Sequence, residues 1–394
     1  MRRWLSILTC LFLPVIVLAQ GGTITGKIIS AASKAPVPKA SVFLSNATFG
    51  TATDDEGNFS LRGVKPGQYD LVVTTLGFEE YSKKILVGAQ AITLNIELTP
   101  KIMMMKSVTI ISNADWKKNY EQFKKDFIGT TDNAKECKVI NPRVLDLIYY
   151  RKKQELQASA DEFLIMENYA LGYRVKYLLN NFSSNNISRM IEYSGKILFE
   201  ELPGSESQKK KWKQRREDTY YGSAQQFYRS LYKNTLTEDG FVIYNFSRVL
   251  NQDRFPEEFI QKKFKQFKDI NRDSAVFWQR QNDVPKWAQE NLMKPPLAAN
   301  RVLRSTEQEG LYVVTFPYLL YVIYTKKREE TYFRDIYRPL DMENYETSVI
   351  TLLQQPYILF DRNGSVLGNA PLYEGTWSKA KLANMLPVDY EPGD

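Results

Sequence analysis

Residues 23–99 alternate between apolar and polar positions in short runs separated by turn residues. Within 68–75, Tyr69, Leu71 and Val73 occupy every second position, which places their side chains on one face of a strand. Acidic residues at 54–58 and the Pro-Gly pair at 66–67 separate successive runs. This spacing predicts an all-β sandwich of seven strands, over 23–30, 40–44, 51–53, 58–61, 68–75, 81–87 and 93–98.

From residue 113 onward, helical and strand periods alternate. Trp116, Tyr120, Phe123 and Phe127 recur at spacings of three and four, which predicts an amphipathic helix with one apolar face. Gly129 is suited to end that helix. Two further helices are predicted at 256–268 and 283–293, and a last one at 377–386.

The longest predicted helix covers 205–236. Ser205 followed three residues later by Gln208 is a capping-box pair, and Tyr220, Phe227 and Leu231 contribute to an apolar stripe. Alternation predicts strands on both sides of this helix. They are expected at 145–149, 164–166, 173–177, a hairpin at 191–199 turning at 194–195, a run at 311–325 interrupted by Pro317, 348–353 and 357–360, with a turn at 361–364.

The first nineteen residues have the composition of a cleavable signal peptide. Two arginines precede an apolar stretch, which ends in a site of small residues. We expect cleavage after Ala19, with cleavage after Gln20 as the alternative. No later run reaches the roughly 18 to 20 apolar residues of a spanning helix. The mature chain is therefore predicted to be exported to the periplasm, the outer membrane or the cell surface, without an integral membrane span.

These patterns divide the 394 residues into four parts. They are a signal peptide at 1–19, a β-sandwich at 20–100, a β-prone linker at 101–112 and a larger domain at 113–394. The predicted fold class is α+β multidomain, with an all-β N-terminal sandwich and an aromatic-rich antiparallel sheet accompanied by several helices in the larger domain.

The composition excludes several catalytic classes. The chain has no histidine and two cysteines, of which Cys10 is predicted to leave with the signal peptide. Ser-His-Asp triads, Cys-His pairs and histidine zinc sites are therefore impossible. We predict no catalytic residues, no cofactor and no metal site, and we interpret Cys137 as a buried apolar thiol.

Carboxylate chemistry remains open. Acidic doublets at 161–162, 200–201 and 329–330 could contribute to a glycosidase pair. Neighbouring residues on a strand point to opposite faces, however, so solvated surface charge is the simpler interpretation. The acids at 54–58 could hold calcium, although one short turn offers few ligands.

The basic run at 209–216 is the candidate binding surface. It contains Lys209, Lys210, Lys211, Trp212, Arg215 and Arg216. The formal net charge of +8 is mild, and an exported protein rarely meets nucleic acid, so no nucleic-acid partner is predicted. The run could face anionic lipid or polysaccharide. The alternative is a solvated helix face with Trp212 packed inward.

Three motifs of the N-terminal block resemble a known module. G-T-A-T-D-D-E-G-N-F-S-L at 50–61, P-G-Q-Y-D-L at 66–71 and L-G-F at 76–78 are similar to the carboxypeptidase regulatory-like domain. The resemblance implies a transthyretin-like or prealbumin-like β-sandwich that accompanies other domains. It identifies a module and implies no activity.

The rest of the chain also resembles a family. Residues 116–142, 167–179, 220–236 and 373–386 are similar to the carboxypeptidase-like regulatory domain-containing proteins of Bacteroidetes. Those relatives often carry histidine before the phenylalanine of S-x-x-H-F-x-R-S-L, whereas this chain has Gln226. A role for that histidine therefore does not transfer, and the resemblance implies no catalytic residue.

These observations predict a non-catalytic envelope protein of a Bacteroidetes-type cell. It would be a binding or assembly module for an envelope protein or a glycan, and the alternative is a carboxylate-dependent glycan-active enzyme. Alternating aromatic residues in 140–202 are interpreted as cross-strand core, with a sugar-stacking platform as the alternative. The structural observation that bears most on this function is whether 113–394 form a concave, aromatic-lined cleft with converging polar groups.

Overall fold

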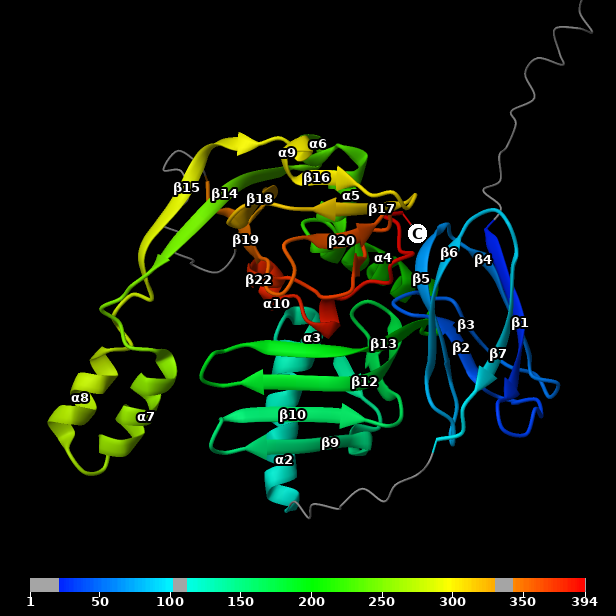
Figure 1. Cartoon of the computed structure of the whole chain (residues 1–394), viewed down its shortest axis with the longest axis horizontal. Helices are drawn as coiled ribbons and strands as arrows, with labels where there is room; N and C mark the ends of the chain where they lie inside the picture. Colours follow the sequence, from blue (N-terminus) through cyan, green and yellow to red (C-terminus); the bar gives the residue numbers. More distant parts are fainter. Residues whose placement is uncertain (1–20, 102–111, 330–342, 394) are drawn as a thin grey trace, which may run out of the picture. The chain divides into compact units, whose positions relative to one another are not determined.

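The computed structural model describes residues 21–101, 112–329 and 343–393 (Figure 1). Described residues 21–43 and 49–101 form one compact unit, and 44–48 with 112–393 form a second. The predicted signal peptide and the interior of the predicted linker lie outside the described residues. No helix in the described part of the chain has both the length and the apolar composition to cross a membrane.

The first unit is the predicted sandwich, and all seven strands are present. One sheet has the order β4 (Asn58–Val64), β1 (Gly22–Ser30) and β7 (Ile92–Leu98). The other has the order β3 (Gly50–Ala52), β2 (Ser41–Leu44), β5 (Gly67–Thr74) and β6 (Tyr81–Val87). β1 and β7 pair in parallel, whereas β1 with β4, β2 with β3 and β5 with β6 pair antiparallel. The apolar positions of these strands, such as Ile28 and Leu71, form the buried core.

The turn at 54–58 forms as predicted. The Asp54 carboxylate accepts a hydrogen bond from the Asn58 backbone N–H at 2.7 Å, and Gly57 has a φ of 78°. That backbone hydrogen bond holds the pKa of Asp54 below its ordinary value. The acidic side chain therefore closes a turn through the backbone.

The second unit begins with the predicted amphipathic helix. α2 (Asn113–Phe123) continues into a π-helical turn (Lys124–Ile128) and ends at Gly129, whose φ is 107°. Phe123 and Phe127 are fully buried and contact Phe182 of the adjoining sheet edge to face. The predicted apolar face of the helix is therefore confirmed.

Six antiparallel strands form the sheet behind which α2 lies in Figure 1. The long strand β12 pairs on one side with β13, and on the other side with β11 and β10 at its two ends, while β8 and β9 occupy the edges. The strands are β8 (Cys137–Val139), β9 (Leu145–Tyr150), β10 (Glu155–Ala160), β11 (Leu164–Asn168), β12 (Tyr173–Asn185) and β13 (Ile191–Glu201).

The predicted hairpin turn at Ser194-Gly195 is wrong. β13 continues through both residues, and the turn lies before it, between β12 and β13. Gly195 is instead next to a register shift in the pairing with β12. A Cβ atom there would lie 2.3 Å from the Tyr177 ring, so the glycine permits close packing instead of a turn.

The predicted single helix at 205–236 is two helices, α4 (Glu206–Tyr220) and α5 (Ala224–Lys233). The capping box of Ser205 and Gln208 is confirmed. Gly222 has a φ of 89°, and the Ser223 side chain caps α5 by accepting the Gln226 N–H. Ser223 is a residue type that favours the N-cap position, so it marks the start of α5. The apolar stripe runs through this position, and the prediction therefore joined the two helices.

Two further sheets complete the second unit, and α5 packs into a core that both sheets share. One has the order β15 (Trp287–Leu297), β14 (Phe241–Leu250), β18 (Leu319–Arg328), β19 (Tyr345–Thr351) and β22 (Leu372–Gly375). The other has the order β16 (Leu303–Ser305), β17 (Leu311–Val314), β20 (Ile358–Asp361) and β21 (Val366–Leu367). The apolar run broken at Pro317 thus supplies one strand to each sheet.

The helix predicted at 283–293 is wrong, because most of that segment belongs to β15. The two helices of this region are α7 (Glu257–Phe267), as predicted, and α8 (Arg272–Arg280). The Asn271 side chain caps α8 by accepting the Ser274 N–H at 2.9 Å. This cap starts the second helix before the predicted range, and Pro285 separates it from β15.

Short helical segments connect the remaining strands. The helix predicted at 377–386 is interrupted, with α10 (Thr376–Lys379) followed by a 3₁₀ turn (Leu382–Asn384). The others are α3 (Asp132–Lys135), a 3₁₀ turn (Pro142–Val144), α6 (Leu236–Asp239) and α9 (Ala299–Val302). The predicted fold class, a seven-stranded sandwich followed by an α+β region, is confirmed.

Candidate binding cleft

A cleft of about 500 Å³ lies within the second unit, which is in the usual range of ligand pockets. One wall is the start of β13 with the turn before it. The other walls are the loop 352–358, the loop 368–371 with β22, and α10. In Figure 1, β22 and α10 lie beside β13, so segments far apart in sequence border the cleft.

Two aromatic side chains in the cleft wall are held by hydrogen bonds at their polar ends. The Trp377 indole N–H donates to the Gly222 carbonyl at 2.7 Å, and the hydroxyls of Tyr373 and Tyr228 lie 3.0 Å apart. The rings of Tyr373 and Trp377 contact each other edge to face at 5.6 Å. Burial raises the pKa of Tyr373, so its hydroxyl stays neutral. Tyr373 is partly buried and adds ring surface to the cleft wall, whereas Trp377 is 7% exposed and packs in the core of the second unit.

Two more tyrosines add aromatic surface. Tyr193 packs against the buried Phe127 ring at 5.2 Å, which anchors it to the core of the α2 sheet. Tyr357 is 39% exposed and is the most accessible of the aromatic residues that line the cleft. The cleft is therefore lined by aromatic residues from three separate segments.

Amide and hydroxyl groups lie among these rings. Asn369 donates to the Gln354 side chain at 2.8 Å, which links two of the lining loops. Gln355, Ser194 and Ser378 also line the cleft. Groups of this kind donate and accept hydrogen bonds without bringing net charge.

The cleft contains few ionisable groups. Glu192 contributes the one carboxylate among its lining residues, and Arg189 and Lys381 contribute the cations. Burial lowers the pKa of Lys381, which the nearby Asp126 partly opposes. A carboxylate pair of the kind that cleaves glycosidic bonds needs a second acid, which this lining does not supply.

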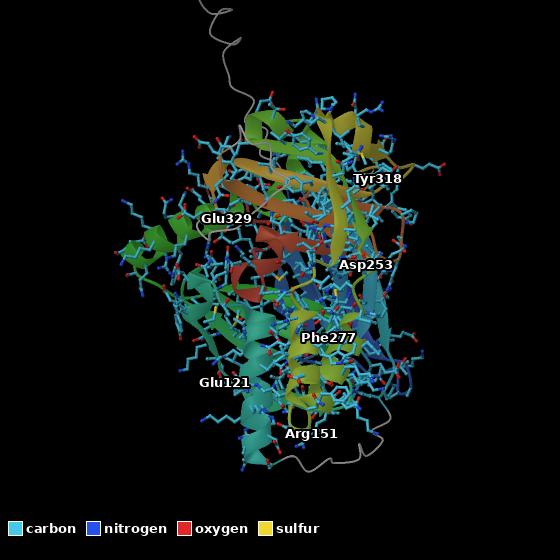
Figure 2. The ribbon with its side chains drawn as sticks, turned by 90° about the vertical axis from the view of Figure 1, so that its left-hand side faces the viewer. Glu121, Arg151, Asp253, Phe277, Tyr318 and Glu329 are labelled. Atoms are coloured by element: carbon cyan, nitrogen blue, oxygen red, sulfur yellow. The ribbon has the colours of Figure 1, made fainter. Side chains whose placement is uncertain are left out.

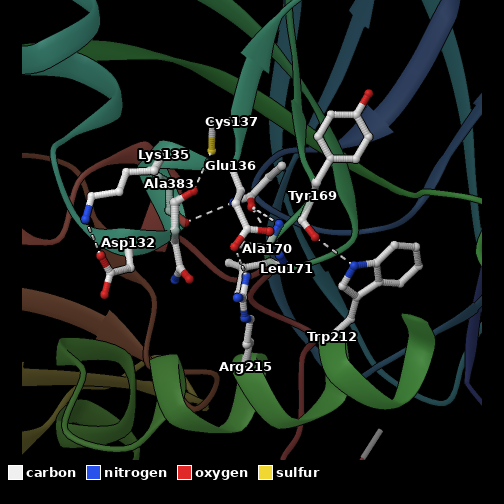
Figure 3. A network of polar contacts seen from close by, with 12 residues as sticks. Asp132, Lys135, Glu136, Cys137, Tyr169, Ala170, Leu171, Trp212, Arg215 and Ala383 are labelled. Atoms are coloured by element: carbon white, nitrogen blue, oxygen red, sulfur yellow. Dashed lines mark hydrogen bonds and ion pairs between the residues drawn. The ribbon is translucent and has the colours of Figure 1, made fainter. Parts of the chain in front are cut away.

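The residues of the predicted basic surface at 209–216 are partly buried and partly exposed. Trp212 is buried, and its indole N–H donates to the Tyr169 carbonyl at 2.8 Å (Figure 3). The indole fits against Gly172, where a Cβ atom would lie 2.2 Å from the ring, and the φ of 72° at this residue also favours glycine. Trp212 therefore anchors α4 to the sheet. This agrees with the alternative prediction, in which Trp212 packs inward from a solvated helix face.

Arg216 is also buried. Its guanidinium donates to the Leu171 carbonyl at 2.8 Å, pairs with Glu201 at 2.8 Å and lies over the Tyr173 ring at 3.9 Å. Arg216 thus contributes to the packing of α4. Its side chain is not available to a ligand.

The other basic residues of the run lie toward solvent. Arg215 pairs with Glu136, as Figure 3 shows, and Lys209 pairs with Glu206 at 3.0 Å. Lys210 and Lys211 are exposed. The prediction of a binding surface therefore stays a prediction for the exposed lysines.

Acidic residues of the predicted doublets each pair with a different basic side chain. Glu200 pairs with Lys176 and Glu201 with Arg216, so these neighbours point to opposite faces. Glu329 pairs with Lys379, whereas residue 330 lies outside the described part of the chain. In the described ranges, no group of three or more acidic or cysteine side chains is arranged to hold a metal ion.

Cys137 is half-buried. Its thiol donates to the Asn133 carbonyl at 3.3 Å, and burial raises its pKa to about 12. A thiol in this state is a poor nucleophile at neutral pH.

Sequence reasoning did not identify Arg229 as a buried residue of the second unit. Its buried guanidinium donates to the carbonyls of Asn363, Val388 and Tyr390 at 2.8 to 2.9 Å. These bonds fix the turn after β20 and the C-terminal segment to α5. The aromatic residues at 373 and 377 stood in the stretch that resembled the family, which was the signal for this part of the cleft.

Comparison with known proteins identifies the first unit. Residues 24–110 match the family model of the CarboxypepD_reg-like domain. The predicted resemblance of the N-terminal block is therefore confirmed. A search of curated proteins found no match.

Solved structures give only remote similarities. A pilus 2b backbone protein of group B streptococcus is 24% identical over 20% of this chain and 41% of its own, with a TM-score of 0.18. A putative carbohydrate-binding protein from Bacteroides uniformis is 10% identical over 40% of this chain and 57% of its own, with a TM-score of 0.18. The TIE protein of Bacillus anthracis is 14% identical over 47% of this chain and 32% of its own, with a TM-score of 0.19. Similarity of this extent assigns no function.

Proposed function

We propose that this chain is a non-catalytic, exported binding protein of the cell envelope, whose cleft holds a segment of a glycan. The observation that carries the proposal is the cleft of about 500 Å³, in which fixed aromatic rings lie among amide and hydroxyl groups. Sugars present apolar C–H faces and many hydroxyls, and rings with neutral hydrogen-bonding groups match both.

Neutral polar and aromatic groups make up most of the described lining, beside the charged side chains of Arg189, Glu192 and Lys381. Tyr373 uses its hydroxyl within the fold, so it offers a ligand ring surface alone, and the buried Trp377 ring packs against it. Glu192 stands without a second lining carboxylate. The cleft therefore fits glycan binding better than hydrolysis by paired carboxylates. Export and envelope location rest on the composition of residues 1–19.

Calorimetric titration of the purified chain with envelope polysaccharides and their oligosaccharides tests this proposal. Tyr357→Ala removes the most accessible ring, and we expect it to weaken glycan binding about fivefold or more, by analogy with the stacking of a nucleic-acid base on a ring, which contributes about 1–3 kcal/mol. Tyr318→Ala is the matched control, since Tyr318 is 56% exposed and does not line the cleft.

Two results would contradict the proposal. Equal binding by the Tyr357→Ala and wild-type chains would place the ligand elsewhere. Product release from a polysaccharide that stops in Glu192→Gln would instead establish the enzymatic alternative, and chromatography of the incubated glycans detects it.

A further inference from the structure

Exposed apolar side chains are concentrated between residues 249 and 277. In the described part of the chain, seven of the seventeen large apolar side chains that are exposed fall in this short segment. Water-exposed apolar groups at this density mark an interaction surface. They are Val249, Leu250, Phe255, Phe259, Ile270, Val276 and Phe277.

The segment includes a folded helical hairpin. α7 and α8 pack against each other, with Ile260 fully buried and Ala275 9% exposed. Its base is closed by Arg254, which donates to the Val284 carbonyl at 2.8 Å and pairs with Glu257 at 2.6 Å. The hairpin therefore has an internal core, and its exposed apolar residues are additional to that core.

An aromatic face lies along this hairpin. We define it as Phe255, Phe259, Phe277 and Trp278. The rings of Phe255, Phe259 and Trp278 contact one another at 5.2 to 5.6 Å, and Phe277 contacts Trp278 at 5.1 Å. Figure 2 shows Phe277 on the hairpin. None of the four lines the cleft of the proposed function, so the aromatic face is a separate surface.

Basic residues accompany the aromatic face. The Lys263 ammonium lies 5.6 Å from the Phe259 ring centre and 5.8 Å from that of Phe267, on the same stripe of α7. Lys262, Lys265 and Lys268 follow on this helix, and no acid occurs from Phe259 to Lys268. Acids lie in the first turns of α7 and α8, where the helix dipole favours them, and Asp269 after α7 lies 3.7 Å from the Lys268 ammonium.

We propose that the α7–α8 hairpin docks on an anionic lipid surface, with the aromatic face entering the headgroup region and the lysines contacting lipid phosphates. Phenylalanine and tryptophan beside lysine form the composition of helices that lie in a membrane interface. A second copy of the hairpin is a poorer partner, since a two-fold contact between aromatic faces would bring the lysines of both copies together.

The exposed lysines of α4 provide the contrast. Lys210 and Lys211 also face solvent, but Trp212 beside them is buried in the fold. That helix offers charge without an apolar face. The hairpin offers both positive charge and an apolar face, and stable attachment to a membrane interface depends on these two properties together.

Co-sedimentation of the purified chain with phosphatidylcholine vesicles, with and without phosphatidylglycerol, tests the proposal. We expect binding to the anionic vesicles that weakens as salt is raised. The Phe259→Ser, Phe277→Ser double variant should bind at least about tenfold more weakly, because it loses two exposed rings that would be buried in the headgroup region. Lys262→Gln and Lys265→Gln should each weaken binding about fivefold, and only to anionic vesicles.

Matched controls separate this site from others. Leu76→Ser and Tyr318→Ser change exposed apolar residues elsewhere, and Lys210→Gln with Lys211→Gln changes exposed lysines of α4; all should bind like the wild type. Circular dichroism melting confirms that each variant is folded. Absent vesicle binding by the wild type, loss of binding only in the α4 variant, or a dimer in light scattering that Phe277→Ser dissociates would overturn the proposal.

Discussion

Arg229 shows how one buried side chain connects distant parts of the second unit. It is 2% exposed and donates to main-chain carbonyls of the turn after β20 and of the C-terminal segment. The planar guanidinium carries five donors, which a single lysine could not replace. Sequence reasoning could not select it among 53 basic residues, because arginine is usually exposed and only tertiary contacts reveal its burial.

Asp361 lies at the same turn and predicts a pH dependence of stability. Burial raises its pKa to about 6, although the N–H groups of Asn363 and Ser365 donate to it. The folded state thus holds this proton more tightly than the unfolded state, whose carboxyl has the ordinary value of 3.8. The resulting contribution to stability is fully present below the unfolded pKa and is lost as pH rises through about 6.

We therefore expect the unfolding free energy of the wild type, relative to Asp361→Asn, to fall by about 1–3 kcal/mol between about pH 4 and about pH 7. Urea unfolding at both pH values measures the difference, and Asp253→Asn serves as a control at an exposed position. A difference that stays constant with pH would show that Asp361 has the same pKa in both states.

At the scale of elements, the break between α4 and α5 depends on Gln226. Its side-chain oxygen accepts the buried Gly222 N–H at 2.7 Å, and the Trp377 indole donates to the carbonyl of the same glycine. The break therefore holds an aromatic residue of the cleft wall. The sequence predicted the helical stripe and its first cap, but hydrophobic period alone cannot show a three-residue interruption when both helices bury the same face.

Substitutions at Gln226 test this role. Gln226→Leu should lower the unfolding free energy by about 1–3 kcal/mol, because the Gly222 N–H loses its partner. Gln226→His should cost less above about pH 6.5, since neutral imidazole can accept the bond, and more below it, since protonated imidazole cannot. Denaturant unfolding at two pH values measures both effects; equal stability of the leucine variant and the wild type would contradict them.

The whole molecule consists of two units with separate cores. In the first unit, the core positions are those that alternation along the strands predicted, including Ile28 and Leu71. All strand pairs of its two sheets lie within residues 22–98. We expect the fragment 21–101 to fold alone, because its sheets require no strand from the rest of the chain.

Far-UV circular dichroism of this fragment should show β structure and one cooperative thermal transition. Leu71→Ala should lower its unfolding free energy by about 2–5 kcal/mol, since Leu71 is fully buried. Asp253→Asn, made in the full chain, is the control: it changes a residue of the second unit and should leave the unfolding free energy of the sandwich unchanged. A fragment without a cooperative transition would show that the sandwich needs the second unit in order to fold.

The sequence by itself determined the sandwich, the two-part organisation, most strands and the helix that begins the second unit. Those features follow from local alternation, turn residues and caps, which act over a few positions. It also determined that histidine chemistry is absent. The turn predicted at 194–195 was wrong, because Gly195 allows the Tyr177 ring to pack closely against the strand and does not reverse the chain.

Only the tertiary structure decided which side chains line the cleft. The cleft joins β13 to loops and a helix more than 150 residues later, so no local pattern describes it. Burial in turn removed Trp212 and Arg216 from the predicted basic surface and left the aromatic rings of α7 and α8 in water. The reason is physical: the period of a helix or strand shows which residues share a face, whereas packing between distant elements decides whether that face is covered.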